Sequence, residues 1–368
     1  MDLLTLVRQL LADGSVARVA ANPLAQFGTP EAPLLGATLL PEQLTAVNEY
    51  RETAIRYRTV IANAGTRYSP AQIKDGSVLS GEMLVTLADE DIAAQFTGRD
   101  YDALIQLLNQ RPTMDAAVRL INWLDVAINR ALIHLTEKQR WDALVDAQVV
   151  RTGDNGYSET IAYSNPSGHR VNAGGTWSDN NYDPYPDIVA GAQKLADKGY
   201  MVARMIGSRK VAYILARNAK MQARVGGRIT VDTGGTMRSA PRPLVTLADL
   251  NAIFSADGLP QLELYESRYR DYAGTHRFLA DTALVMVATT GREQVITDTN
   301  VENGNLEIIP DTLGYTAIGR PVGQTDPGRV IMMEPKADKP PRVEAQGWQT
   351  SLPVITEPEA IYVVKQIA

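Results

Sequence analysis

The apolar positions of this chain change their spacing as the sequence proceeds. Between Ala117 and Leu135, apolar residues recur at steps of three and four, and Thr113 precedes them as a candidate N-cap. This spacing predicts one amphipathic helix from Thr113 to about Leu144, which would be ~45 Å long at about 1.5 Å per residue. Such a helix is long for the core of an enzyme and favours an element that forms the spine of a subunit.

Two stretches rich in β-forming residues come before this helix. They cover residues 51–70 and 78–96, and we expect them to form a long β-hairpin within residues 49–98. Arginine and tyrosine residues are interleaved in its first limb, whereas Asp89, Glu90 and Asp91 lie near its end. The hairpin residues that we expect at an interface between subunits are Arg51, Arg56, Tyr57, Arg58, Arg67, Tyr68 and Lys74.

The charge of the whole chain decides which partner this hairpin favours. Cations beside aromatic rings also form stacking platforms for nucleic acid. However, the chain carries a formal net charge of −6 at pH 7, which argues against a protein that binds phosphates by releasing counterions. We therefore expect the basic limb to contact acidic surfaces of a protein partner.

The region after the long helix mixes short strands and short helices. Residues 147–165 alternate polar and apolar positions around a Gly-Asp-Asn-Gly turn, which predicts a second β-hairpin. Gly199 is placed to end the helix that follows, and Ser208 is placed to begin the next one. A strand is predicted between these two helices at 200–206. The last third combines long Gly/Pro loops with predicted strands at 262–265, 282–289 and 360–367.

The first residues have a different character from the rest. Up to Gly36, a weakly amphipathic helical pattern alternates with Pro and Gly, which predicts an N-terminal arm over residues 1–48. An arm is ordered only where it lies on another surface, and a neighbouring chain could provide one. Because the region before the hairpin is short, we expect no fused scaffolding domain.

Composition places the chain among ordered globular proteins. Its 368 residues are 45% hydrophobic, which is enough to fill one large domain or two smaller ones. The absence of cysteine excludes disulfides, thiolate metal sites and a cysteine nucleophile. No apolar run of membrane-spanning length and no signal-peptide pattern is present, so we expect synthesis in the cytoplasm and no membrane partner.

The sequence offers little that indicates catalysis. His134, His169 and His276 are far apart and have no partners at metal-ligand or triad spacing. The segment Gly207–Lys210 lies between a predicted strand and a predicted helix, where backbone N–H groups could bind an anion. It lacks the glycines of a phosphate-binding loop, so an ordinary capped helix start is favoured. We expect no catalytic residue and no cofactor.

The stretch GGTWSDNNYDPYPDIVAG, residues 174–191, raises the question of a metal site. Asp179, Asn181 and Asp183 alternate as the first ligands of a calcium loop do. That loop needs glycine at its sixth position and glutamate at its twelfth, where this chain has Pro184 and Ala190. We therefore expect no metal here, and interpret the stretch as a stiff connector in which Asp187 meets the positive end of the following helix.

Several strings occur in an order that resembles one protein family. The strings are LTEKQRWDALVDAQV (135–149), TWSDNNYDPYPDI (176–188), KGYMVARMIGSRKVAYILARN (198–218), LELYESRYRDYAGTHRFLADTALVMV (262–287) and TSLPVITEPEAIYVVKQI (350–367). Together they resemble the lambda-like major capsid protein E family of tailed bacteriophages, which has the Hong Kong 97 type of capsid fold. The likeness covers residues 34–368. One departure is Leu279-Ala280-Asp281, which lacks the proline often found there.

The resemblance implies an α+β fold of the Hong Kong 97-like type with five parts. They are an N-terminal arm (1–48), an extended hairpin (49–98), a peripheral domain with the spine helix (99–175), a mixed α/β axial domain (176–340) and a C-terminal strand segment returning to the core (341–368). It further implies a non-catalytic capsid protein that assembles with itself, as hexamers and pentamers, into the icosahedral head shell of the virion.

The resemblance also implies partners and a place of assembly. Scaffolding, decoration and portal proteins are possible partners, the packaged double-stranded DNA is enclosed without sequence-specific binding, and assembly takes place in the cytoplasm of the bacterial host. Two alternatives stay open at this point. One is a soluble hydrolase or lyase with a calcium-stiffened loop from Asp179 to Asp187, and the other is a monomeric binding module whose hairpin is a ligand face.

Overall fold

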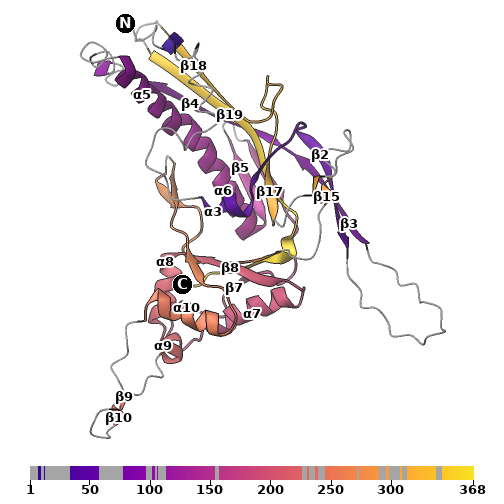
Figure 1. The fold of residues 1–368 in the computed structure, drawn as a ribbon, viewed down its shortest axis with the longest axis vertical. Helices are drawn as coiled ribbons and strands as arrows, with labels where there is room; N and C mark the ends of the chain where they lie inside the picture. The colour runs from indigo at the N-terminus through magenta and orange to yellow at the C-terminus, as the bar shows by residue number, and fades with distance from the viewer. Residues whose placement is uncertain are drawn as a thin grey trace, which may run out of the picture.

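The structure is a computed structural model, and parts of the chain are described in it. These are residues 7–9, 12, 34–57, 78–96, 102–103, 106, 113–153, 157–225, 230–231, 237–238, 245–271, 273–289, 296–297, 307–308, 313–336 and 342–368. The described residues form two main sheets, one long helical element that lies along the first sheet, and a hairpin that diverges from it (Figure 1).

The first sheet is built around the 14-residue strand β19 (Arg342–Ile355). Three strands pair antiparallel with β19, and β1 lies parallel to one of them. These strands are β1 (Glu42–Leu44), β4 (Ala88–Phe96), β17 (Gly314–Ile318) and β18 (Arg329–Lys336). The sheet therefore joins the N-terminal segment, the base of the hairpin and the C-terminal third of the chain.

The second sheet has the strand order β11–β8–β14–β20–β7. Its strands are β7 (Arg170–Asn172), β8 (Met201–Gly207), β11 (Leu262–Leu264), β14 (Leu284–Thr289) and β20 (Ile361–Lys365). Four helices accompany it: α7 (Tyr185–Ala196), α8 (Arg209–Arg217), α9 (Ala219–Val225) and α10 (Leu247–Ala256). The strands predicted over 200–206, 262–265, 282–289 and 360–367 are thus confirmed.

The predicted long helix is present and runs without interruption through three segments. They are α5 (Thr113–Leu124), the π-helical turn η1 (Asp125–Asn129) and α6 (Arg130–Asp146). The buried carboxylate of Asp125 accepts hydrogen bonds from Asn129 Nδ2 at 3.0 Å and Arg130 Nε at 2.9 Å, which stabilises the wide turn. Helix α5 packs on the first sheet, whereas the end of α6 enters the core of the second.

The predicted hairpin exists but is shorter on its second limb than expected. Strand β2 (Glu49–Tyr57) pairs antiparallel with β3 (Val78–Thr86). Residues 88–96 instead leave the hairpin as β4 and pair with β19. The division falls at Leu87, whose side chain is buried between the hairpin and the first sheet together with Tyr315 and Leu352. The hairpin therefore diverges from the body beyond its base (Figure 1).

The second predicted hairpin is confirmed, whereas three strands of the first sheet, β1, β17 and β18, were not predicted. Strands β5 (Gln148–Thr152) and β6 (Ser158–Ala162) pair antiparallel, as the hairpin prediction requires. Strands β17 and β18 fall in the region expected to consist of Gly/Pro loops, because β17 is only five residues long and β18 contains Pro335. The smaller elements are α3 (Leu35–Leu39), β9 (Thr230–Val231), β10 (Met237–Arg238), β12 (Arg268–Arg270), β13 (Thr275–Arg277), β15 (Ile296–Thr297), β16 (Glu307–Ile308) and η4 (Pro358–Ala360).

Candidate functional site

The N-terminal segment is fixed to the body through one buried carboxylate, that of Glu137 on α6. Its Oε1 accepts hydrogen bonds from the backbone N–H of Gly36 at 2.7 Å, from Trp141 Nε1 at 2.9 Å and from the Tyr265 hydroxyl at 2.8 Å. Glu137 has no exposed surface, so these donors replace the water that it loses. One side chain thereby joins the N-terminal segment, the long helix and the loop after β11.

Position 36 admits no side chain in this arrangement. A Cβ atom there would lie 2.7 Å from both carboxylate oxygens of Glu137. Glycine therefore permits the backbone of α3 to approach the carboxylate closely enough for the hydrogen bond. On the other side of Glu137, burial and the adjacent negative charge raise the pKa of Tyr265 well above its usual value, so its hydroxyl stays protonated and donates.

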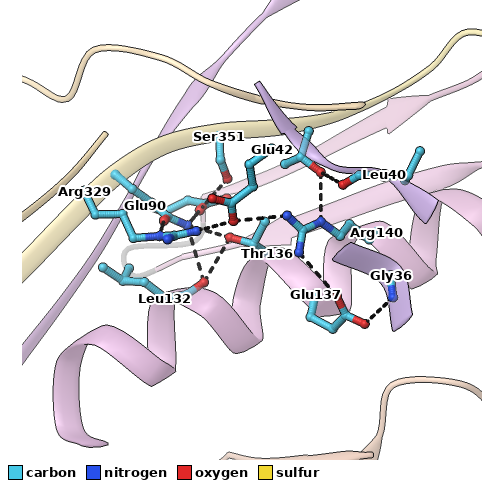
Figure 2. Close-up of polar contacts among 12 residues, drawn as sticks. Gly36, Leu40, Glu42, Glu90, Leu132, Thr136, Glu137, Arg140, Arg329 and Ser351 are labelled. Carbon is cyan, nitrogen blue, oxygen red and sulfur yellow. Dashed lines mark hydrogen bonds and ion pairs between the residues drawn. The ribbon is translucent and has the colours of Figure 1, made fainter. Parts of the chain in front are cut away.

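Arg140, one turn further along α6, makes the second attachment. Its guanidinium is 1% exposed; Nε donates to Thr316 Oγ1 at 2.8 Å and Nη2 donates to Glu42 Oε1 at 3.1 Å. Arg329 on β18 donates to the same oxygen of Glu42 at 2.5 Å (Figure 2). Burial alone would raise the pKa of Glu42, but Arg329 and Arg140 outweigh it and hold that pKa below its usual value. Strand β1 is thus locked beside β17 by charge as well as by backbone pairing.

A second buried carboxylate, Glu90, fixes the base of the hairpin. Its Oε2 accepts from Gln349 Nε2 at 2.6 Å and from Ser351 Oγ at 2.9 Å, and its Oε1 accepts from Gln139 Nε2 and lies 3.7 Å from Arg151 Nη2. Burial raises the pKa of Glu90, and these hydrogen bonds and Arg151 oppose the rise only in part. The first strand after the hairpin is therefore joined to α6, β5 and β19 at one point.

The stretch before α7 is a connector that is held by its own side chains. Asp187 accepts hydrogen bonds from Trp177 Nε1 at 2.8 Å, from the Tyr182 hydroxyl at 2.8 Å and from Gly174 N at 3.2 Å. Burial and the bond to Asp187 raise the pKa of Tyr182 to about 12. Asp187 lies in the first turn of α7, as expected, and it also ties the two ends of the stretch together.

The remaining acidic residues of this connector point to separate partners. Asp179 accepts from the backbone and side chain of Asn181, and Asp183 pairs with Arg224 at 2.6 Å. Among the described residues, no three acidic or histidine side chains are grouped in a way that could hold a metal ion. The turn chemistry expected from the sequence is therefore what these carboxylates perform.

The structure places only some of the expected interface residues. Arg51, Arg56 and Tyr57 lie along β2, where Arg51 pairs with Leu84, Arg56 with Leu79 and Tyr57 with Val78. The other four, Arg58, Arg67, Tyr68 and Lys74, lie outside the described residues. Their role at an interface stays a prediction.

The expected helix start at Gly207–Lys210 is an ordinary capped one. Ser208 Oγ accepts from Val211 N at 3.1 Å, and the carboxylate of Glu266 accepts from Arg209 N at 2.6 Å. The three histidines lie in separate places: His134 packs against Phe278, His169 Nδ1 lies 3.0 Å from Ile361 O, and His276 contacts Asp271.

The anchoring residues Glu137, Arg140 and Glu90 were not found by sequence reasoning. Glu137 and Arg140 lie at helical spacing within a stretch that is otherwise amphipathic, and local patterns place such residues in solvent. Their partners are distant in sequence: Gly36 lies 101 positions before Glu137, and Tyr265 lies 128 positions after it. The only signal was that both residues belong to the string LTEKQRWDALVDAQV.

Two solved structures have this fold over nearly their whole length. The putative capsid protein of a prophage from E. coli CFT073 is 15% identical with a TM-score of 0.57, and the alignment covers 96% of this chain and 97% of that one. A phage-related protein from Bordetella bronchiseptica RB50 is 15% identical with a TM-score of 0.51, covering 92% and 94%. The fold is thus the Hong Kong 97-like fold of phage capsid proteins. No curated protein sequence matches the chain.

The family itself is shown by sequence. The family model "Phage major capsid protein E" matches residues 106–365, which is more than two thirds of the 368 residues. The chain belongs to the phage major capsid protein E family. It is a structural protein of the phage head shell and a component of the virion, and its subunits assemble with one another into that shell. The alternative of a hydrolase or lyase with a calcium-stiffened loop has no support. None of the described helices has both the length and the apolar character needed to span a bilayer.

Proposed function

We propose that this capsid protein forms hexamers and pentamers of an icosahedral shell, in which the β2–β3 hairpin reaches over a neighbouring subunit and the N-terminal arm extends across another. The first sheet with the long helix then acts as the peripheral domain, and the second sheet packs around the capsomer axis as the axial domain. The subunit catalyses nothing, because it contributes to the head through its shape and its contacts with neighbouring subunits.

The observation that carries this proposal is how the hairpin is attached. Its base is fixed by Glu90 and by the buried side chains of Val85 and Leu87. Beyond the base, β2 and β3 pair with each other along nine residues each, and the main contact of β2 with a further described element is with the two-residue strand β15. A two-stranded hairpin has little stability by itself in water. A rigid base beneath a hairpin that needs a further surface is the arrangement expected of an element that binds a neighbouring subunit.

The same proposal includes what the shell encloses and what it meets. The double-stranded DNA lies inside without sequence-specific binding, scaffolding, decoration and portal proteins are the candidate protein partners, and assembly takes place in the cytoplasm of the bacterial host. The net charge of −6 supports a shell that confines a polyanion without gripping it over its whole surface.

Charge reversal on the hairpin tests the proposal. Arg56 lies on β2, and Arg58 follows two positions further along the limb predicted from the sequence, where alternation of side chains would place both on one face. We expect Arg56→Glu with Arg58→Glu to leave the circular dichroism spectrum of the subunit unchanged and to block or distort shell formation in negative-stain electron microscopy and light scattering. The matched control is Arg56→Lys with Arg58→Lys, which should form normal shells. Normal shells from the glutamate variant would contradict the role of the hairpin.

A further inference from the structure

Six exposed cations on α8, α9 and the β12–β13 hairpin form no direct ion pair with a carboxylate that the structure describes. The six residues, which we name the basic face, are Arg209, Lys210, Arg217, Lys220, Arg268 and Arg270. We propose that the basic face binds the phosphate backbone of the duplex DNA inside the shell. The inference rests on the proposed function, in which the shell encloses DNA, and it adds which part of the subunit meets that DNA.

Helix α8 carries part of this charge on its exposed side. Its buried side carries Val211, Ile214 and Leu215, whereas Lys210 and Arg217 are exposed on the other side with Tyr213 between them. The Arg217 guanidinium lies 4.1 Å from the centre of the Tyr213 ring, which holds it in place. Residues 209–225 include no Asp or Glu, so no negative charge from α8 or α9 themselves reduces the field of this face.

The hairpin β12–β13 extends the basic face beyond α8. Arg277 on β13 pairs with Glu266 at 2.6 Å, and the same carboxylate accepts from Arg209 N at 2.6 Å, so the base of this hairpin lies at the start of α8. In Figure 1 the orange hairpin rises beside α6 on the same side of the molecule as α8. Tyr269 packs inward on Phe278 with ring centres 5.2 Å apart. Arg268 and Arg270, the residues before and after it on β12, are exposed on the opposite face of the strand.

The acidic residues around the basic face form ion pairs with other residues. Glu263 pairs with Arg204, Glu266 and Asp281 with Arg277, Asp271 with His276, and Asp183 with Arg224. None of the six cations forms an ion pair with any residue that the structure describes. Arg209 interacts electrostatically with the nearby Glu266 carboxylate. The other five cations have no acidic partner among the described residues and are available for another molecule.

The spacing and the surroundings of these charges favour a phosphate polymer. About 10 Å separates Lys210 from Arg217 along α8, and a duplex offers phosphates at such intervals whatever its sequence. A second copy of the chain is the competing partner, and competition by an acidic polymer distinguishes it from DNA. The acidic remainder of the subunit would confine DNA contact to this face.

Binding of a fluorescein-labelled duplex of about two helical turns to unassembled full-length subunits tests the proposal. The test variants are Lys210→Gln with Arg217→Gln, and separately Arg268→Gln with Arg270→Gln. The control, Lys198→Gln with Lys365→Gln, removes one exposed and one half-buried cation that lie elsewhere and have carboxylate partners. We expect each test variant to lose at least fivefold in affinity at about 50 mM salt and its salt dependence to fall by about 1.8 in slope, with the control within twofold of wild type.

Three results would overturn the inference. They are no duplex binding by the wild type at low salt, equal affinity of test and control variants, or displacement of the duplex by poly-glutamate as readily as by unlabelled duplex, which would assign the face to an acidic protein. Electron microscopy of the same samples separates this inference from the proposed function. Normal wild-type shells without duplex binding refute only the inference, whereas duplex binding by the basic face without shells supports it and contradicts the proposed function.

Discussion

The two regions of this subunit are held together by different chemistry. In the second sheet, four consecutive residues of β14 (Leu284 to Val287) are at most 2% exposed and all are apolar. Where α6 meets the first sheet, the buried residues include Thr136, Glu137, Gln139 and Arg140. The region of the second sheet has an ordinary apolar core. The junction between α6 and the first sheet is a network of charges and hydrogen bonds.

This difference has a physical consequence for how each region responds to change. Apolar contacts have little directional preference, so a core of this kind accepts residues of similar volume. A buried carboxylate is stable only while all its donors are in position, so the junction around Glu137 fixes where the N-terminal segment and the loop after β11 must lie. The polar junction therefore specifies geometry, and the apolar core supplies bulk stability.

The largest expected effect comes from removing the central carboxylate of the polar junction. Glu137→Ala leaves Arg140 with less compensation and leaves the Gly36, Trp141 and Tyr265 donors without their acceptor. We expect the free energy of unfolding of the subunit, measured in urea, to fall by about 3–5 kcal/mol. Lys138→Ala, at a partly exposed neighbouring residue, is the control and should cost less than about 1 kcal/mol. Equal effects of the two changes would contradict the importance of the junction.

The apolar region should respond to volume rather than to chemistry. Leu284→Ala removes a fully buried side chain and should lower the free energy of unfolding by about 2–4 kcal/mol. Leu284→Met keeps most of the volume and should cost less than about 1.5 kcal/mol. If Leu284→Met were as damaging as Leu284→Ala in the same urea titration, the contrast between the two regions would be lost.

A smaller effect is expected from one methyl group at the polar junction. In Gly36→Ala the new Cβ would lie 2.7 Å from the Glu137 carboxylate. Alanine is otherwise favoured over glycine in a helix by up to about 1 kcal/mol, so a net loss of about 1–3 kcal/mol has to come from this contact. Gly153→Ala, where the Cβ would be 3.4 Å from Tyr157, should be near neutral.

A double-mutant cycle with Glu137→Asp identifies the source of the Gly36→Ala loss. The shorter carboxylate withdraws from position 36, so the two changes together should cost less than the sum of the separate changes by at least about 0.5 kcal/mol. Strict additivity in the cycle would place the strain elsewhere.

The smallest effect concerns pH. The pKa of Glu42 lies below its usual value of 4.5, because Arg329 and Arg140 favour its charged form and outweigh burial. Its contribution to stability is therefore present above that usual value and is lost as the pH falls through the lowered one. Glu42→Gln should cost less than about 1 kcal/mol at pH 7, since the side chain is 37% exposed, and the cost should shrink towards pH 3 in urea titrations. A cost that does not change with pH would indicate packing rather than charge.

The elements that local patterns encode were predictable, and the junctions were not. The helix from Thr113 follows from apolar residues three and four apart, and the β5–β6 hairpin follows from its Gly-Asp-Asn-Gly turn. Strand β17 gave no alternation because all five of its residues are buried. The division of the hairpin at Leu87 depends on β19, which lies more than 200 residues further along the chain. No local pattern reports a pairing over that separation.

The candidate site shows the same limit. The hairpin was found because its strands are rich in β-forming residues, and the family resemblance gave its role as an expectation. Glu137 and Glu90 carry nothing in their neighbourhoods that distinguishes them from solvent-exposed glutamates. What makes each of them an anchor is a set of donors brought from three separate parts of the chain by the completed fold.

The π-helical turn at Asp125–Asn129 bears on how the length of the long helix can vary. Each residue of an α-helix turns its successor by about 100° around the axis. Deleting one residue from α6 before Arg140 would rotate the rest of α6 relative to α5, so that Leu124 and Arg140 could no longer face the same sheet. The π-helical turn is the exception, because its hydrogen bonds span five residues instead of four and it could lose one residue by becoming α-helical. An insertion paired with a deletion elsewhere in the helix, or an insertion of about one whole turn, would keep α5 and α6 facing the same sheet. Substitutions along this helix should therefore be tolerated more readily in natural variants than single-residue insertions or deletions outside the π-helical turn.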